Sequence, residues 1–430
     1  MTLAAPSWLP LALLGLLAAA IILGGGVAPG AAALLCLLTG VIGLFAASSR
    51  RLPSLPPAVW GLALLWSGVA LASIIWSRQL DASLAELAAV ICAALVWMLG
   101  ATLVDGKARR RFVVGLAICG AAVALLALAE AVPGQPASMP LGGPNHLAAW
   151  LLLPGSLALV ALLHSEPTGR GAGESAFLWF GLAGIIGAGI AAAASRGASL
   201  AAALALAALL ILYLLGPQRG IIVGATGIVA AALFLFFAPT LATAPLPVAV
   251  GGGGSSAGMS WAAHAASAST ALDVQPLGAE IGAFASSFQA YRPPTIHHVA
   301  GLAHGDSLRG LARLGLPFLA AFAVTVFVAV LGARGTLSRP RSPRCTWGAV
   351  IATLSLSALS LTDSHLDVPA IALSGAALAG LAFAGIDIGE GKHRAFDRDQ
   401  SSAATRATVA GLSIVLLVMA ANQAAALVTW

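Results

Sequence analysis

The chain has 430 residues, of which 60% are hydrophobic and 8% are charged. A soluble globular domain carries about 25% charged residues, so this composition excludes a soluble enzyme or a soluble binding module. The net charge of +6 is not combined with basic patches interleaved with exposed aromatics, which argues against a nucleic-acid-binding protein. Apolar runs recur along the whole length, and each is long enough to cross about 30 Å of hydrocarbon.

These runs predict an all-α protein, a polytopic transmembrane helical bundle of 12–13 spans that forms a single domain over residues 1–430. The abundance of Ala and Gly suits closely packed membrane helices. The first run lacks a basic leader and a small-residue cleavage site, so we expect a span rather than a cleavable signal. In chain order the predicted spans are 9–27, 31–47, 58–75, 84–104, 112–132, 147–163, 176–194, 198–215, 220–238, 314–333, 347–362, 369–387 and 407–426.

The distribution of Lys and Arg predicts the orientation of the bundle. With a cytoplasmic N-terminus, the cytoplasmic connections hold 16 of the 21 Lys and Arg, and we expect them to contact anionic membrane lipids. A thirteenth span would place the C-terminus outside the cytoplasm. None of the four cysteines falls on the outer side, so no disulfide framework is expected. The five basic residues of the outer side are Arg78, Arg196, Arg292, Arg309 and Arg313.

One outer-side connection, residues 239–313, is far longer than the others. Its Pro-rich start and the glycine run at 251–254 indicate a flexible linker, and no Gly-Lys-Ser/Thr follows that would make the run a phosphate loop. Segments with helical spacing come next, and the last of them begins at His304. A loop of this length is usually functional or disordered, and its helical segments and low charge favour a functional lid.

Polar residues near the bilayer are costly, so those of the outer side are the candidates for chemistry. Arg196 lies at a turn between two spans, where it could grip a phosphate with its forked guanidinium or extend to lipid headgroups. His304 and Asp306 have a spacing that lets a carboxylate orient an imidazole able to accept a proton near neutral pH. The alternative for His304 is a loop histidine that is hydrogen-bonded to the backbone.

Two arginines follow on the same predicted helix. Arg309 and Arg313 are four residues apart, so their charges repel each other unless an anion lies between them. The alternative is that both face phospholipid headgroups. His297 and His298 do not form a zinc spacing with His304, and no metal site is expected.

A second polar cluster occurs late in the chain, where Asp363, His365 and Asp367 lie on the same predicted side. We interpret Asp81 and Glu86 as acidic charges near the start of a helix, where they interact favourably with the helix dipole.

Four segments together resemble the bacterial O-antigen ligase/O-antigen polymerase family. "PLGAEIGAFASSFQAYRPP" from Pro276, followed by "HGDSLRGLARLG" from His304, is similar to the family's loop signature, which ends in a His-Asn-Asp-Tyr-Leu motif. "SRGAS" at 195–199, "GGPNHLAAWLLL" at 142–153 and "DSHLDVPAIAL" at 363–373 resemble three further segments of the family. Their order and predicted topology agree from about residue 60 to residue 390.

The resemblance implies a membrane glycosyltransferase at the periplasmic face of the bacterial inner membrane. Such an enzyme moves a glycan from undecaprenyl diphosphate to a hydroxyl of a saccharide or lipid A–core acceptor, with no metal or nucleotide cofactor. His304, Asp306 and Arg196 would be the catalytic residues. The candidates for substrate binding are Arg292, Arg309, Arg313, His298, Asn145, His365 and Asp367.

The sequence departs from the family pattern in the loop. Gly305 stands where the family has asparagine, Ser307 stands where it has tyrosine, and Met259 or Ser260 stands near the place of an early-loop arginine. Polymerase and ligase both remain open, with a slight preference for a polymerase. The alternative from another class is a transporter of a lipid-linked or anionic solute, which would be expected to show repeated halves and polar groups at mid-membrane.

Overall fold

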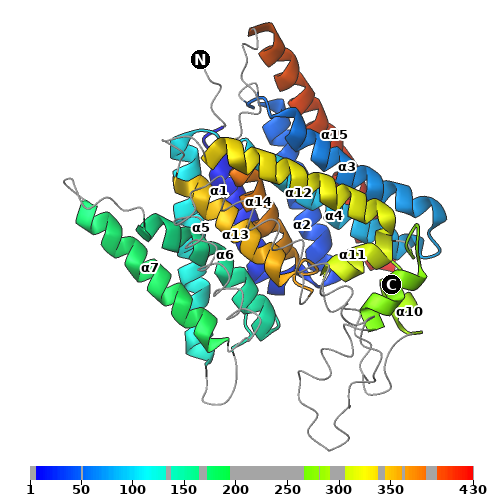
Figure 1. The fold of residues 1–430 in the computed structure, drawn as a ribbon, viewed down its shortest axis with the longest axis horizontal. Coiled ribbons are helices and arrows are strands. Elements are labelled where there is room, and N and C mark those ends of the chain that lie inside the picture. The colour runs from blue at the N-terminus through cyan, green and yellow to red at the C-terminus, as the bar shows by residue number, and fades with distance from the viewer. Residues whose placement is uncertain are drawn as a thin grey trace, which may run out of the picture.

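The computed structural model describes residues 6–49, 52–131, 137–163, 172–193, 266–279, 281–290, 306–337, 344–360, 364–383 and 395–429. Helices make up nearly all of the described chain, and they pack into the bundle of Figure 1. The long helices are α2 (Pro29–Ser48), α3 (Pro57–Ser73), α4 (Leu80–Ala101), α5 (Gly106–Glu130), α6 (Pro144–Leu163), α7 (Ala172–Ala192), α12 (Leu316–Leu337) and α15 (Ala395–Thr429). The shorter ones are α1 (Leu9–Ile22), α10 (Phe284–Phe288), α11 (Asp306–Leu314), α13 (Arg344–Leu359) and α14 (Pro369–Phe383).

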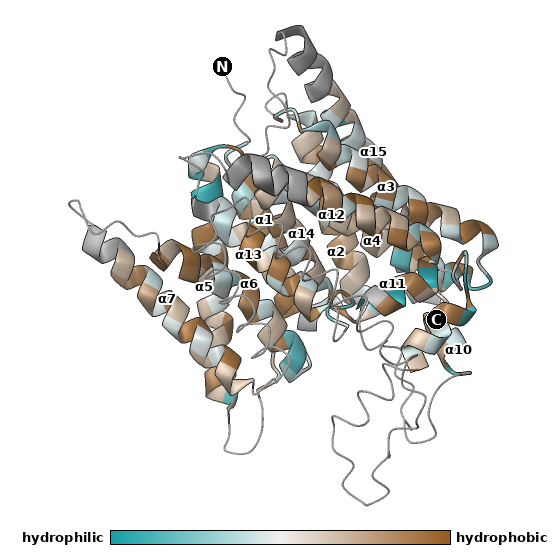
Figure 2. Ribbon diagram, viewed as in Figure 1, coloured by the Kyte–Doolittle hydropathy of each residue, from teal (hydrophilic) through white to brown (hydrophobic). Residues whose placement is uncertain are grey.

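Six of the described helices are long and apolar enough to cross a membrane, and five shorter apolar helices accompany them. The prediction of an all-α, multi-pass membrane bundle is therefore confirmed. Eleven of the thirteen predicted spans each coincide with a described helix, and the spans at 198–215 and 220–238 lie outside the described residues. Figure 2 shows hydrophobic residues along the lengths of α3, α7 and α12.

Local chemistry sets where the helices begin and end. Proline is the first residue of α2, α3, α6 and α14, where its missing N–H removes no helical hydrogen bond. The first span was predicted to reach residue 27, but α1 ends at Ile22 because Gly24, Gly25 and Gly26 have positive φ angles. The span predicted to start at 112 starts earlier instead, since the Asp105 side chain accepts the Ala108 N–H and caps α5. The basic run after Asp105 is therefore helical.

Small residues allow α4 and α14 to pack closely at the centre of the bundle. A Cβ added to Gly380 would collide with the Trp97 carbonyl oxygen, and one added to Gly100 would collide with that of Ala377. The two glycines therefore bring the backbones together, as is common for membrane helices. Beside them the rings of Trp97 and Phe383 meet edge to face, with centroids 5.7 Å apart.

Two groups of polar contacts lie at opposite ends of the bundle. At one end, where α5 and α13 begin, buried Arg109 donates to the carbonyl oxygens of Leu103 and Val104 and to Thr346 Oγ1, at 3.2 Å each. At the other end, α4, α6, α12 and α14 all begin, and the backbone N–H of Ala137 donates to Ala192 O. We call this second end the site end, because the candidate residues that the structure describes lie there.

The close approach of α4 and α14 yields a stability prediction. We expect Gly380→Ala to lower the free energy of unfolding by about 1–3 kcal/mol, because the added methyl meets backbone that has no room to move. Gly68→Ala in α3 is the matched control, since a Cβ there has no neighbour within 4 Å and alanine favours helix by up to about 1 kcal/mol. Thermal unfolding in detergent measures both. Equal melting temperatures for the two variants would contradict the close packing.

Candidate functional site

Helix α11 is a short amphipathic helix at the site end, joined to α12 by a single glycine. Gly315 has φ +62°, and its N–H donates to Leu311 O at 2.8 Å, as expected for a glycine that ends a helix. Residues 276–279 bind the turn between α11 and α12 through the backbone, because Leu316 N–H donates to Pro276 O and Ala279 N–H donates to Ala312 O. The position of α11 relative to residues 276–279 is thus fixed by the backbone.

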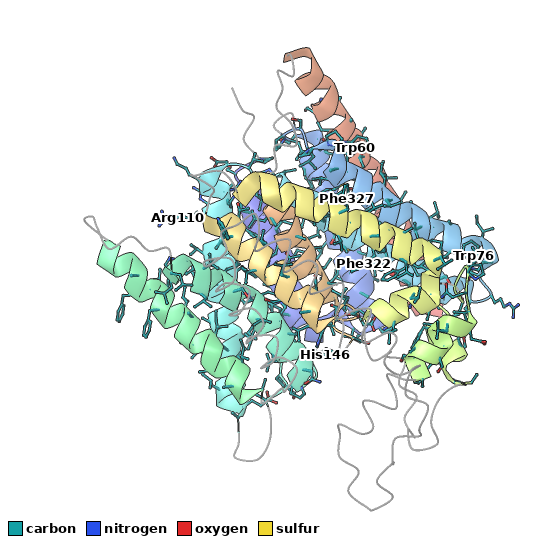
Figure 3. All side chains as sticks on the ribbon, in the orientation of Figure 1. Trp60, Trp76, Arg110, His146, Phe322 and Phe327 are labelled. Atoms are coloured by element: carbon teal, nitrogen blue, oxygen red, sulfur yellow. The ribbon has the colours of Figure 1, made fainter. Side chains whose placement is uncertain are left out.

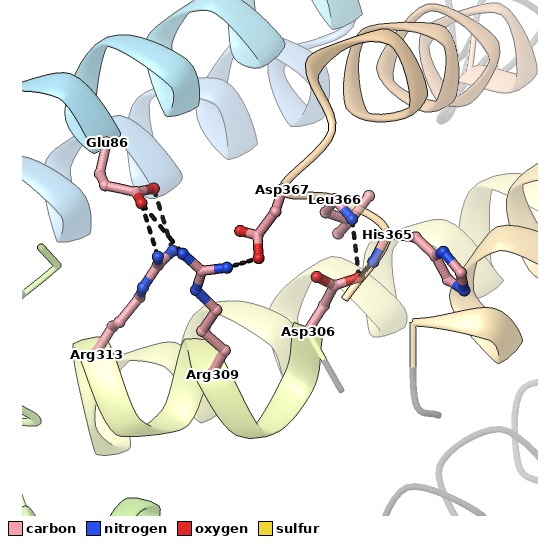
Figure 4. A network of polar contacts seen from close by, with 7 residues as sticks. All are labelled: Glu86, Asp306, Arg309, Arg313, His365, Leu366 and Asp367. Carbon is pink, nitrogen blue, oxygen red and sulfur yellow. Dashed lines mark hydrogen bonds and ion pairs between the residues drawn. The ribbon is translucent and has the colours of Figure 1, made fainter. Parts of the chain in front are cut away.

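Glu86 on α4 faces both arginines of α11 (Figure 4). Its carboxylate accepts two hydrogen bonds from Arg313, at 2.7 and 3.1 Å, and one from Arg309 at 3.4 Å. A forked guanidinium paired with both oxygens of a carboxylate is a strong, directional contact. Glu86 therefore supplies the anion that two arginines four residues apart require.

Arg309 contacts residues from three other segments. It pairs with Asp367 in the segment before α14 as well as with Glu86, and its guanidinium lies 5.9 Å from the centre of the Phe284 ring. Its side chain is only 10% exposed. Burial, and then the nearby charge of Arg313, lower the pKa of Arg309 to about 9, so it is still protonated at neutral pH. The side chain joins α4, α10, α11 and the start of α14.

Asp306 connects the first residue of α11 to the segment before α14. Its carboxylate accepts the backbone N–H groups of His365 and Leu366, both at 3.0 Å. Burial raises the pKa of Asp306 to about 6, and the N–H donors oppose this rise only in part. Asp306 is therefore a carboxylate whose charge changes in the mildly acidic range.

His146, near the start of α6, contacts the segment before α14 and is labelled in Figure 3. Its ring meets that of His365 edge to face, with centroids 5.7 Å apart, and His365 is 2% exposed. One turn further along α6, Trp150 donates its indole N–H to Ser374 Oγ on α14 at 3.0 Å. The contact between α6 and α14 is thus specific, and Asn145 lies beside it in the sequence.

The structure brings together many of the residues that the sequence singled out. Asp306, Arg309, Arg313, His365 and Asp367 form one contact network, and Figure 2 shows hydrophilic residues at α11. The network uses the two arginines within the protein, where the sequence analysis had considered a bound substrate or lipid headgroups. Arg196, Arg292, His298 and His304 lie outside the described residues, as does Asp363.

The pairing of Glu86 with the arginines was not predicted from the sequence. Asp81 does lie in the first turn of α4, as expected for a charge at a helix start. Glu86 is instead the seventh residue of the helix and pairs with the arginines. The signal that could have revealed it is the arginine pair itself, which requires an acidic partner on the same side of the membrane.

No family model matches the chain, and no curated protein matches it. The described cluster contains two arginines and three carboxylates, so its charges are nearly balanced and its direct effect is to hold α11 in place. An anionic ligand at this end would need cations in addition to Arg309 and Arg313.

The raised pKa of Asp306 yields a prediction with a defined sign. Because the folded protein holds this proton more tightly than the unfolded chain does, the contribution of Asp306 to stability falls as pH rises from about 4 to 6. Asp306→Asn keeps an oxygen acceptor but carries no charge, so its melting temperature relative to the native protein should rise across this range and level off above it.

Asp306→Ala is the companion variant. It leaves two N–H groups without their acceptor and should lose about 1 kcal/mol of stability at every pH. Thermal unfolding at a series of pH values measures both variants. A difference between Asp306→Asn and the native protein that stays constant from pH 4 to pH 7 would contradict the assignment.

Proposed function

We propose that the chain is a membrane glycosyltransferase that moves a glycan from undecaprenyl diphosphate to an acceptor hydroxyl at the periplasmic face of a bacterial inner membrane. The observation that carries the proposal is the convergence of three segments that are far apart in the sequence. Residues 144–146, 306–313 and 364–367 meet at the site end, and each belongs to a motif that resembles the O-antigen ligase/polymerase family. A bundle without a common site would not need these segments to meet.

The proposed reaction is a direct displacement at the anomeric carbon. The acceptor oxygen forms a bond to that carbon, the bond from the carbon to the diphosphate oxygen breaks, and undecaprenyl diphosphate leaves with the electron pair. His304 takes the proton of the acceptor hydroxyl, and Arg196 and Arg292 offset the negative charge that grows on the diphosphate. The lipid diphosphate is itself the leaving group, so the proposed reaction uses no nucleotide or metal cofactor.

The described cluster has a positioning role in this proposal. Asp306 follows His304 by two residues, and its hydrogen bonds to His365 and Leu366 fix the chain at that point. Arg309 and Arg313 hold the rest of α11 against α4 through Glu86. A base must be held in a defined place to accept a proton during the reaction, because small displacements lower the rate strongly.

The distribution of charge favours this function over transport. In α1 to α7, α12 and α14, every Asp, Glu, Lys and Arg lies within two turns of a helix end. Transporters of charged solutes usually bind them near the middle of the membrane, between interrupted helices. In these helices the charged side chains lie instead toward the helix ends, where a lipid-linked headgroup would be met.

The activity prediction uses purified protein, undecaprenyl diphosphate-linked glycan and candidate saccharide and lipid A–core acceptors, with release of the lipid carrier as the readout. His304→Ala and Arg196→Ala should each lower the rate about 100- to 10,000-fold, the usual contribution of such groups. His393→Ala and Arg219→Ala are matched controls on the predicted cytoplasmic side and should keep the native rate.

Membrane insertion and elution as a single species should be unchanged in all four variants. Native rates in both His304→Ala and Arg196→Ala would remove these residues from the mechanism. The length of the product separates the two forms of the activity: a polymerase extends the acceptor into a ladder, whereas a ligase adds one preassembled chain.

A further inference from the structure

A hollow of about 470 Å³ opens at the site end beside α11. One wall comes from the connection between α3 and α4, with Trp76, Arg78 and Gln79, and the other from residues 273–287. Figure 3 places Trp76 at this end of α3 and α4. The volume falls in the range of about 300–1,000 Å³ that is typical of small-molecule sites.

The hollow is adjacent to the cluster around Glu86. Gln79 precedes the first residue of α4, and Glu86 lies seven residues further on, about 10 Å along the helix axis. The opposite wall contacts α11 directly, because the Gln275 amide nitrogen donates to Leu311 O at 3.3 Å and Ala279 N–H donates to Ala312 O at 2.7 Å. A ligand in the hollow would therefore lie next to the helix that follows His304.

The lining has the composition expected of a site for a polyhydroxylated, uncharged molecule. Among the described residues it has one guanidinium and one carboxylate, Arg78 and Asp273, a pair that does not favour a phosphate. Amides of Gln79 and Gln275 and hydroxyls of two serines also line it, and the Gln79 amide nitrogen donates to Ser286 Oγ at 3.2 Å. The indole of Trp76 adds a flat apolar surface, against which the C–H groups of a sugar ring can pack.

Two buried polar atoms of the lining lack a partner within the described part of the chain. These are the indole nitrogen of Trp76, a donor, and the side-chain oxygen of Gln275, an acceptor. Such groups are rare in folded proteins and call for an explanation. Sugar hydroxyl groups both accept and donate, so a saccharide that enters with a small shift of the lining side chains would satisfy both atoms.

We propose that this hollow binds a saccharide. Given the proposed function, on which this further assignment rests, that saccharide is the acceptor glycan, held beside α11 while the lipid-linked donor approaches from the membrane. Trp76 supplies the stacking surface and Asp273 accepts hydrogen bonds from sugar hydroxyls.

The test is calorimetric titration of the purified full-length protein in the absence of the lipid-linked donor. The four probes are linear tetrasaccharides, each built from a single sugar: glucose, galactose, mannose or N-acetylglucosamine. We expect saturable binding of at least one probe. Trp76→Phe keeps a ring but removes the N–H, and Asp273→Asn removes the charged acceptor; each should weaken binding about tenfold. Trp8→Phe and Asp81→Asn change the same residue types outside the lining and should leave the affinity unchanged.

Absence of saturable binding by all four probes would overturn the assignment, and so would an affinity that is the same in Trp76→Phe, Asp273→Asn and the native protein. Displacement of the bound probe by inorganic diphosphate would show an anion site and would overturn it as well.

The outcome of this test can be told apart from that of the test of the proposed function. Saccharide binding by a protein that transfers no glycan supports the hollow and counts against the transferase. Glycan transfer in which Trp76→Phe and Asp273→Asn keep the native acceptor KM counts against the saccharide site in the hollow but not against the transferase.

Discussion

The site end depends on one carboxylate placed between two guanidinium groups. Arg309 and Arg313 are largely buried side chains on successive turns of α11, and without an anion they would repel each other in a setting where charge is poorly solvated. Glu86 contacts both and thereby joins α11 to α4. Removing one partner of such a group is costly because the other charge stays behind, so the cluster disfavours positions of α11 that separate these charges.

The remaining contacts extend from this position. Asp367 pairs with Arg309, and Asp306 accepts the N–H groups of residues 365 and 366, so the segment before α14 is held against α11 at two points. Through His365 and His146 the same segment reaches the start of α6. The hollow beside Trp76 shares the backbone of α11 as one of its supports. A fixed helix at the site end, with the proposed base just ahead of it in the sequence and a polar hollow beside it, is the arrangement on which the proposed glycan transfer rests.

The sequence was sufficient to predict the helices because each must be apolar over a bilayer thickness, and this leaves a strong local signal. It also predicted a helix in the region of α11, where Leu308, Leu311 and Leu314 are buried. It could not predict that Glu86 pairs with Arg313, since the two are 227 residues apart and their meeting depends on how α4 and α11 pack. Helix ends were misjudged where a single side chain decides them, as at Asp105.

A double-mutant cycle on Glu86→Gln and Arg313→Gln tests the central claim most directly, with the free energy of unfolding in detergent measured for the four proteins. Because Glu86 is 31% exposed, solvent weakens the pair, and we expect a coupling energy of about 1 kcal/mol. The double variant should then be more stable than the sum of the single losses predicts. Strict additivity would mean that Glu86 and Arg313 do not interact, and the account of how α11 is held at the site end would be wrong.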